Sequence, residues 1–265
     1  MVTHCLLVLA FTASSQSIFN EAGARAAALG NSSASLSDTW SLFNNPGGLG
    51  MLEETTAFGG FHNRFGISGL NTIHAGITHH LPLGSVGFGA IRFGDDVYNE
   101  QALTLAYGNK LGITSLGLRV NYYQLYVEEF DSQNLITFDF GGITTLTEQV
   151  SLGAYIRNVS QSQLRQGSRQ ATPTVLYLGA TYKPLEKLLL TAEVAKDIDL
   201  KPEVKAGLEY QFLKKFSART GINTGGSQHH LGLGFNSGQL KIDATSSWHP
   251  VLGFSHQASV SYQLL

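Results

Sequence analysis

Apolar and polar residues alternate with a period of two over much of the chain. Between residues 203 and 213, one set of alternate positions is apolar: Val204, Ala206, Leu208, Tyr210 and Phe212. The positions between them hold Glu, Lys, Gly and Gln. Successive side chains of a strand point to opposite faces, so this pattern predicts a strand with one apolar and one polar face. The apolar face contacts either a protein core, with water outside, or lipid, with water inside.

The same alternation recurs in about fourteen segments from residue 55 onward. They span 55–63, 71–81, 84–93, 99–109, 112–127, 133–146, 150–158, 173–183, 187–196, 203–213, 215–223, 228–236, 239–248 and 254–265. Tight and longer connections follow each other in turn, as in outer-membrane barrels, where short turns face the periplasm and longer loops face outward. An even number of strands then places the N- and C-termini on the periplasmic side.

Composition favours a barrel over a soluble sandwich. Charged residues make up 14% of the chain and glycine accounts for 30 of its 265 residues, whereas soluble globular chains are roughly 25% charged. The water-facing rows of a sandwich normally carry dense Lys and Glu, but the polar rows here are mostly Gly, Ser, Thr and Asn. We therefore predict an all-β, transmembrane antiparallel β-barrel of about fourteen strands, formed by residues 55–265 and surrounded by outer-membrane lipid. A β-sandwich is the alternative.

Two neighbouring residues illustrate the predicted faces of the wall. Leu208 lies on the apolar row, so an arginine there is expected to meet lipid and to destabilise the barrel. Gly207 lies on the lumen row, where a small serine is expected to be mild.

Residues 1–17 are similar to a secretory signal peptide. A short apolar run from Cys5 to Phe11 precedes small polar residues, although the basic n-region is missing. A buried N-terminal strand is the alternative interpretation. Cleavage near Ser15 to Ser17 would also remove Cys5, which is the one cysteine of the chain. The mature protein would then have neither disulfides nor thiolate metal sites.

Several functional classes are disfavoured by the sequence. A net charge of −2 without a basic run leaves no electrostatic footprint for nucleic acid. His79 and His80, like His229 and His230, are adjacent on strands and point to opposite faces, so neither pair chelates one metal ion. No local signature of a serine hydrolase supports catalysis. We expect no enzyme activity, no metal site and no cofactor.

Residues 18–54 break the alternation and are rich in Ala, Gly and Ser. They are too many for a simple leader and too few for a domain. We expect this segment to fold back into the lumen as a plug, or hatch. Ser35 or Ser37 is expected to cap a short helix that runs towards Phe43 and ends before Pro46. A periplasmic tail is the alternative.

Two motifs in this segment, GARAAALG at 23–30 and NNPGGLG at 44–50, resemble the N-terminal signature of an outer-membrane family. That family includes the FadL long-chain fatty-acid transporters and the PorV/PorQ proteins of type IX secretion. The resemblance implies a luminal hatch ahead of fourteen strands. The matching hatch positions are Gly23, Ala24, Arg25, Ala28, Leu29, Gly30, Asp38, Asn45, Pro46, Gly48 and Leu49. Gly47 stands where the family commonly has Ala.

Nine charged residues share the predicted lumen-facing rows, and they are of mixed sign. They are Arg119, Asp139, Arg157, Glu193, Lys205, Glu209, Arg219, Lys241 and Asp243. A channel selective for one ion sign is lined mainly by the opposite charge. The mixture therefore indicates charge pairs that brace the lumen and the plug. We expect Arg25 to join them, because a guanidinium bonds two partners from one position.

The resemblance implies one main function and two alternatives. The main prediction is a PorV-like barrel of the bacterial outer membrane that acts as an accessory or docking component of protein export, with secretion-system proteins as partners. The first alternative is FadL-like uptake, with a hydrophobic small molecule as the ligand. The second is a structural outer-membrane barrel without transport. The chain lacks the long extracellular loops with which fatty-acid transporters of this family capture ligand, which argues against transport.

Overall fold

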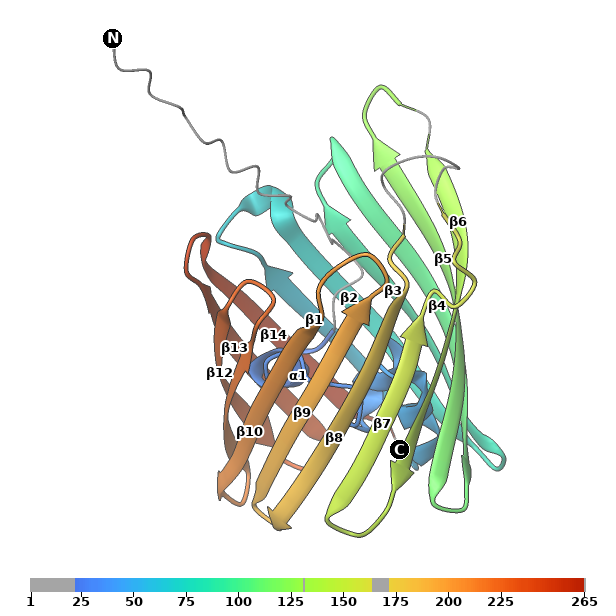
Figure 1. Cartoon of the computed structure of the whole chain (residues 1–265). Coiled ribbons are helices and arrows are strands. Elements are labelled where there is room, and N and C mark those ends of the chain that lie inside the picture. The colour runs from blue at the N-terminus through green and yellow to red at the C-terminus, as the bar shows by residue number, and fades with distance from the viewer. Residues whose placement is uncertain (1–21, 131, 164–171, 265) are drawn as a thin grey trace.

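The computed structural model describes residues 22–130, 132–163 and 172–264. The predicted signal peptide, 1–17, lies outside the described residues, as do residues 18–21 of the predicted plug. Fourteen strands form one closed antiparallel barrel, in which each strand pairs with its neighbours in sequence and β1 pairs with β14 (Figure 1). The predicted fold class is thereby confirmed. None of the described helices is long and apolar enough to cross a membrane.

The strand bounds follow the alternating segments of the sequence to within two residues. The strands are β1 Thr56–Asn63, β2 Asn71–Leu81, β3 Gly84–Gly94, β4 Tyr98–Leu111, β5 Thr114–Val127, β6 Gln133–Thr145, β7 Val150–Arg157, β8 Val175–Leu185, β9 Leu188–Asp197, β10 Glu203–Leu213, β11 Phe216–Asn223, β12 Gln228–Asn236, β13 Leu240–His249 and β14 Gly253–Gln263. A 3-10 turn, η3 Ser68–Leu70, lies between β1 and β2.

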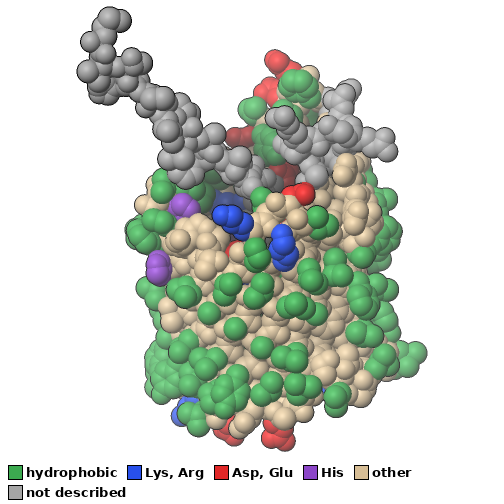
Figure 2. All heavy atoms as spheres, in the orientation of Figure 1, with side chains coloured by type: hydrophobic (Ala, Val, Ile, Leu, Met, Phe, Trp, Pro, Cys, Tyr) green, Lys and Arg blue, Asp and Glu red, His purple; other side chains and the backbone are tan. Residues whose placement is uncertain are grey.

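The apolar rows lie on the outside of the barrel. Leu208 of β10 is 37% exposed, whereas Lys205 on the opposite face of the same strand is 2% exposed. Hydrophobic side chains accordingly cover much of the outer wall (Figure 2). This is the arrangement of a barrel that meets lipid outside and has a polar interior.

The wall is taller on one side than on the other. β4 and β5 have 14 residues each and β6 has 13, whereas β1, β7 and β11 have 8. Short turns such as 81–84, 111–114 and 213–216 join strands at one end, which is the lower end in Figure 1. β4, β5 and β6 rise highest at the opposite, long-loop end (Figure 1).

Residues 22–52, called the inner segment below, lie inside the barrel (blue in Figure 1). They contain a short helix, α1 Ala24–Ala28, and two 3-10 helices, η1 Thr39–Leu42 and η2 Pro46–Met51. α1 lies against β11–β14, and η2 lies against β3–β7. The inner segment therefore spans the interior from one wall to the opposite one.

The helix predicted from Ser35 or Ser37 towards Phe43 differs from the observed one. Asp38 caps η1, because its side chain accepts a hydrogen bond from the Trp40 amide at 3.0 Å. Ser35 bonds instead to Thr181 of the wall, with 2.7 Å between the two hydroxyls. A carboxylate is as good an N-cap acceptor as a hydroxyl, and the serines find partners outside the helix.

η1 ends at Leu42, before Pro46 as expected, and Pro46 begins a further helix. It is the first residue of η2, and Asn45 before it is extended and accepts a hydrogen bond from the Gly47 amide at 2.9 Å. Proline suits the first helical position, since its fixed φ matches the helix and its missing N–H would have no partner there. The restriction on the residue before proline was correctly recognised, but it marks a helix start here.

Candidate functional site

Arg25 in α1 is held by a carboxylate of the barrel wall. Its Nε donates to Oε2 of Glu209 at 2.9 Å, its Nη2 donates to Oε1 of Glu209 at 3.1 Å, and its Nη1 donates to Oδ2 of Asp38 at 3.2 Å. Arg219 of β11 also donates to Glu209, and its Nη1 lies 2.6 Å from Oδ1 of Asp243 on β13. A planar guanidinium suits this pairing because it donates to both carboxylate oxygens. α1 is thereby tied to β10, β11 and β13.

Glu209 is the centre of this network, since it accepts hydrogen bonds from two guanidinium groups. Its carboxylate raises the pKa of Arg25 further above the usual value, although burial acts in the opposite direction. The side chains of Arg25 and Glu209 are 22% and 17% exposed, so they are only partly shielded from water. The contact is a charged clamp that water can reach.

Glu193 of β9 makes a second clamp, which binds the backbone of the inner segment. Its Oε2 accepts hydrogen bonds from the amides of Ser33 at 2.8 Å and Ala34 at 2.7 Å. Its Oε1 accepts one from Nζ of Lys205 on the neighbouring strand at 3.0 Å. A buried carboxylate is costly unless it is paired and hydrogen-bonded, and Glu193 satisfies both conditions.

Arg119 of β5 makes a third clamp, which binds backbone carbonyls. Its Nη1 donates to the carbonyl oxygens of Leu42 at 2.9 Å and Asn44 at 2.8 Å, and its Nε donates to Oδ2 of Asp139 at 2.6 Å. Arg119 is 3% exposed and Asp139 is fully buried. This pair lies on adjacent strands, where the two residues face each other in the register. The wall thus holds the inner segment through its amides on one side and its carbonyls on the other.

Asn45 and Gly47 fit the turn closely against β6. The Asn45 side-chain amide donates to the carbonyl oxygens of Ala34 at 2.5 Å and Gly142 at 3.1 Å. A Cβ added to Gly47 would lie 2.5 Å from Cα of Gly142, closer than two carbon atoms can approach. This contact explains why glycine, with no Cβ, suits position 47. Ser115 of β5 completes the site by donating to the Gly47 carbonyl at 2.6 Å.

The opposite side of the lumen packs against the inner segment through apolar side chains. Trp40 lies edge-on to Phe58 of β1, with 4.8 Å between ring centroids, and Phe43 lies 5.9 Å from the same ring. The two rings belong to one buried cluster with side chains of the wall. The wall side chains of this cluster are called the apolar strip below: Phe58, Ile91, Phe93, Ala102, Ala106, Tyr123 and Leu135. Apolar packing therefore holds the side chains of η1 and Phe43, while Arg119 binds the neighbouring carbonyls of Leu42 and Asn44.

Gly207 contradicts the expectation that serine is mild there. It does face the lumen, but a Cβ at this position would lie 2.6 Å from the carbonyl oxygen of Leu29 and 2.7 Å from its Cα. The neighbouring atoms belong to backbone, which cannot rotate away as a side chain can. The expectation was wrong because the sequence does not reveal that the inner segment passes directly over this glycine.

The predicted positions at the start of the inner segment frame α1. Gly23 precedes the helix with a positive φ of 95°, and a Cβ added there would lie 2.7 Å from atoms of the Trp40 ring. The Ala24 amide donates to Oγ of Ser259 at 3.2 Å, and its carbonyl accepts from Oγ1 of Thr245 at 2.5 Å. These contacts dock α1 on β13 and β14.

The remaining predicted hatch positions are buried in the interior. Leu29 has no exposed surface and packs with Leu36 and Leu189. Gly30 follows with a φ of 71°, and Gly48 and Leu49 are buried within η2.

Two of the nine predicted lumen charges take no part in the clamps described above. Arg157 of β7 is buried with its guanidinium carbon 5.2 Å from the ring centroid of Tyr177. Lys241 shares the inward row of Asp243, but it is exposed near the start of β13, next to the preceding turn. The alternation of the sequence placed Lys241 correctly on the inward row, but it did not show how near the barrel rim this residue lies.

Polar residues without charge were missed by sequence reasoning. Ser115, Thr245 and Ser259 bond directly to the inner-segment backbone. The Asn121 side chain of β5 donates to Oδ2 of Asp139 at 2.9 Å, and the backbone N–H of Asn158 donates to Oδ1 of the same carboxylate at 2.6 Å. Four of these five residues lie within strands, so the alternation of the sequence was the available signal that they face the lumen.

Comparison with solved structures identifies the architecture. The toluene transporter TodX of Pseudomonas putida matches with a TM-score of 0.65 at 12% identity, covering 92% of this chain and 98% of that one. A FadL homologue of Pseudomonas aeruginosa matches with a TM-score of 0.64 at 12% identity and the same coverage. The fold is that of a FadL-type barrel.

The toluene transporter TbuX of Ralstonia pickettii also matches this FadL-type barrel, with a TM-score of 0.62 at 11% identity over 92% of this chain and 98% of that one. No protein-family model and no curated protein sequence matches the chain. At these identities the likeness concerns the fold. The structural neighbours are transport proteins and not enzymes.

Proposed function

We propose that this protein is a bacterial outer-membrane barrel that admits a hydrophobic small molecule, with the inner segment acting as its hatch. In this proposal the short turns and the end of β14 face the periplasm, and the long-loop end faces outward. The names of TodX and TbuX as toluene transporters and of a FadL homologue support uptake over the PorV-like export role. The export role stays a prediction from the sequence motifs alone.

The apolar strip is the observation that carries this proposal. A water-filled barrel normally has a polar interior, so inward aromatic and aliphatic side chains are unusual there. Leu135 and Phe93 lie near the long-loop ends of β6 and β3, and the same cluster continues to Trp40 and Leu42 of the inner segment. A hydrophobic molecule that enters from the long-loop end therefore meets a continuous apolar surface down to the hatch.

The closed state leaves the apolar strip in contact with the hatch. Trp40 and Phe43 pack on Phe58, and a ligand that reaches this level competes with those ring contacts. The clamps at Glu193 and Glu209 hold other parts of the inner segment, from Arg25 to Ala34. Displacement of η1 with α1 still docked would keep these two clamps, but it would break the Arg119 bonds to the Leu42 and Asn44 carbonyls and the bond between Arg25 and Asp38.

Trp40 provides a direct test of ligand binding. The chain has two tryptophans, and Trp248 is 40% exposed on the outer wall. In a Trp248→Phe variant, the fluorescence of Trp40 reports on the hatch alone. Bromobenzene, a heavy-atom quencher and an apolar probe, is expected to quench this signal along a saturable curve. The same protein in Gram-negative cells should raise the initial uptake of radiolabelled toluene or oleate.

Matched variants connect the signal to the apolar strip. Phe93→Gln with Leu135→Gln should weaken both quenching and uptake, whereas Val175→Gln should leave them nearly unchanged. Val175 is an equally buried inward residue on β8, outside the apolar strip. Linear, non-saturable quenching in correctly folded protein, together with uptake equal to that of empty-vector cells, would contradict the proposal.

A further inference from the structure

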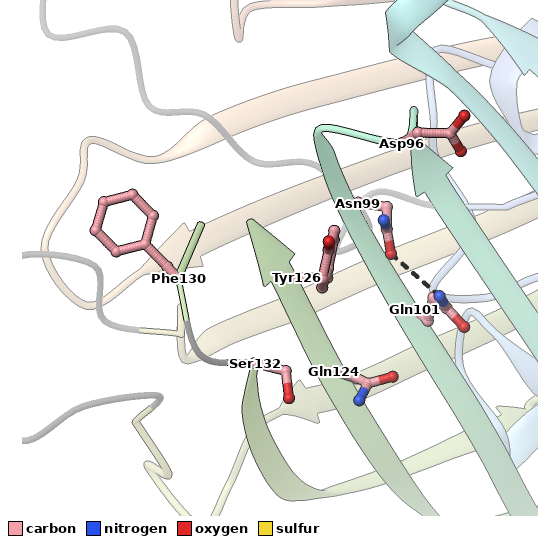
Figure 3. Close-up of a pocket in the computed structure, with 7 residues that line it drawn as sticks. All are labelled: Asp96, Asn99, Gln101, Gln124, Tyr126, Phe130 and Ser132. Carbon is pink, nitrogen blue, oxygen red and sulfur yellow. Dashed lines mark hydrogen bonds between the residues drawn. The ribbon is translucent and has the colours of Figure 1, made fainter. Parts of the chain in front are cut away.

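A shallow polar pocket of about 480 Å³ lies on the outer face of the tall part of the wall (Figure 3). Its lining includes Asn99 and Gln101 of β4, Gln124 and Tyr126 of β5, and Phe130 and Ser132 between β5 and β6. Gln101 and Gln124 are direct partners in the β4–β5 register. Gln101 Nε2 donates to Oδ1 of Asn99 at 3.1 Å, which arranges the two amides side by side (Figure 3).

The pocket continues the lipid-facing rows of the barrel. Gln101 shares its row with Leu103, which is 49% exposed, and Gln124 shares its row with Tyr122, which is 41% exposed. Ala102, between Gln101 and Leu103, points inward and is 2% exposed. The amides of the pocket therefore face outward, away from the lumen and its hatch.

This position determines which part of a lipid reaches the pocket. Two residues along a strand span about 7 Å, so Gln101 and Gln124 lie one row beyond Leu103 and Tyr122. A lipid whose acyl chains pack on Leu103 and Tyr122 places its headgroup at the two glutamines. On the orientation proposed above, that lipid belongs to the outer leaflet.

The chemistry of the lining suits hydroxyl groups. Side-chain amides both donate and accept hydrogen bonds, as do the hydroxyls of Tyr126 and Ser132. The ring of Tyr126 offers an apolar face beside these polar groups. A sugar ring combines the same two features, because its hydroxyls donate and accept while its C–H face packs on an aromatic ring.

The charge around the pocket opposes an anionic headgroup. Asp96 lines the pocket, and Asp95 and Glu129, which neighbour lining residues in the chain, are exposed. Arg92 Nη2 lies 3.6 Å from Oδ1 of Asp96. The backbone amides of Tyr98 and Val97 donate to Asp95 and lower its pKa, so this carboxylate is charged at neutral pH. Like charges repel a phosphate, whereas a neutral sugar meets no such barrier.

The geometry points to a binding site for the neutral saccharide headgroup of an outer-leaflet glycolipid. Gln101 and Gln124 bond to its hydroxyls, Asn99 holds Gln101 in place, and Tyr126 packs on its ring. This site is separate from the lumen and goes beyond the passage of a hydrophobic molecule. The site faces the lipid around the tall part of the wall, which is formed by β4, β5 and β6.

Native mass spectrometry of protein released from nanodiscs tests this site. The nanodiscs contain phosphatidylcholine with equal fractions of diglucosyl diacylglycerol and phosphatidylglycerol. Wild-type protein should retain the glycolipid in preference to phosphatidylglycerol. Gln101→Leu with Gln124→Leu should lower glycolipid retention about fivefold, the loss expected for about one net hydrogen bond. Heat-modifiable migration in gels verifies that each variant is folded.

Two further arms separate the alternatives. Ser246→Leu on β13 adds an apolar residue to the outer wall away from the pocket, and it should leave glycolipid retention unchanged. Equal glycolipid retention by wild-type protein and the double glutamine variant would overturn the assignment. Preferential retention of phosphatidylglycerol by wild-type protein would overturn it as well. So would retention of maltose, which has no lipid tail, to the same extent as the glycolipid. Trp40 quenching by bromobenzene should be unaffected by the glutamine variants, so the two proposals fail independently.

Discussion

The guanidinium of Arg25 and the carboxylate of Glu209 form a two-point contact between residues separated by 184 positions in the chain. One residue belongs to the inner segment and the other to β10 of the wall. Because Glu209 also accepts from Arg219, it holds two cations at the place where the proposed hatch meets the barrel. Removing either member of the pair therefore has different consequences.

Glu209→Gln is expected to be more damaging than Arg25→Met. The glutamine leaves Arg25 and Arg219 facing each other with reduced compensation, whereas Arg25→Met leaves Glu209 paired with Arg219. Hydrogen bonds to charged groups contribute about 1.5–3 kcal/mol each, and Glu209→Gln weakens more of them. The free energy of unfolding in denaturant and the frequency of openings in planar bilayers measure the effect. Equal losses in both variants would contradict the central position of Glu209.

Deletion of residues 22–52 is expected to open a pore. The inner segment spans the interior between opposite walls, so its removal leaves a lumen lined by charges of both signs. Such a lining gives weak ion selectivity. Conductance in planar bilayers should be low for the intact protein and high after deletion. Unchanged conductance in a folded deletion variant would show that these residues do not close the lumen.

Leu208→Arg and Gly207→Ser are expected to damage different parts of the molecule. Arginine at 208 meets lipid and should destabilise the barrel by about 2–4 kcal/mol if the position is near the bilayer midplane. Serine at 207 collides with the backbone of Leu29 and should displace the hatch while the wall stays intact. Heat-modifiable migration reports on the wall and single-channel recording on the hatch. Leu208→Ala serves as the control, and a stable, closed Gly207→Ser barrel would refute the contact.

Trp40→Ala is expected to loosen η1 without unfolding the wall. Large aromatic-to-alanine changes cost about 3–5 kcal/mol in well-packed cores, and Trp40 is 4% exposed between Phe43 and Phe58. Hydrogen exchange should accelerate at residues 39–51 and remain slow in the strands. Trp248→Phe on the outer wall is the matched control. Accelerated exchange throughout the strands would mean that the inner segment supports the entire barrel.

Period-two alternation alone determined the wall of this protein. The segments around Leu208 and Leu233 show one apolar and one polar row, and both lie in strands with their apolar rows outside. Alternation is a local property, because each side chain takes its face from its own position in the strand. Strand bounds, the number of strands and the row of each charged residue could therefore be predicted without knowledge of distant contacts.

The partners of those charges were decided by tertiary structure. The alternation placed Glu193 and Arg119 on inward rows. It did not indicate that Glu193 binds backbone amides and that Arg119 binds backbone carbonyls. Every residue has similar backbone groups, so such contacts leave no mark in the sequence of the inner segment. The same holds for Gly207, whose fit against Leu29 arises when the closed wall brings β10 under a segment far away in the chain.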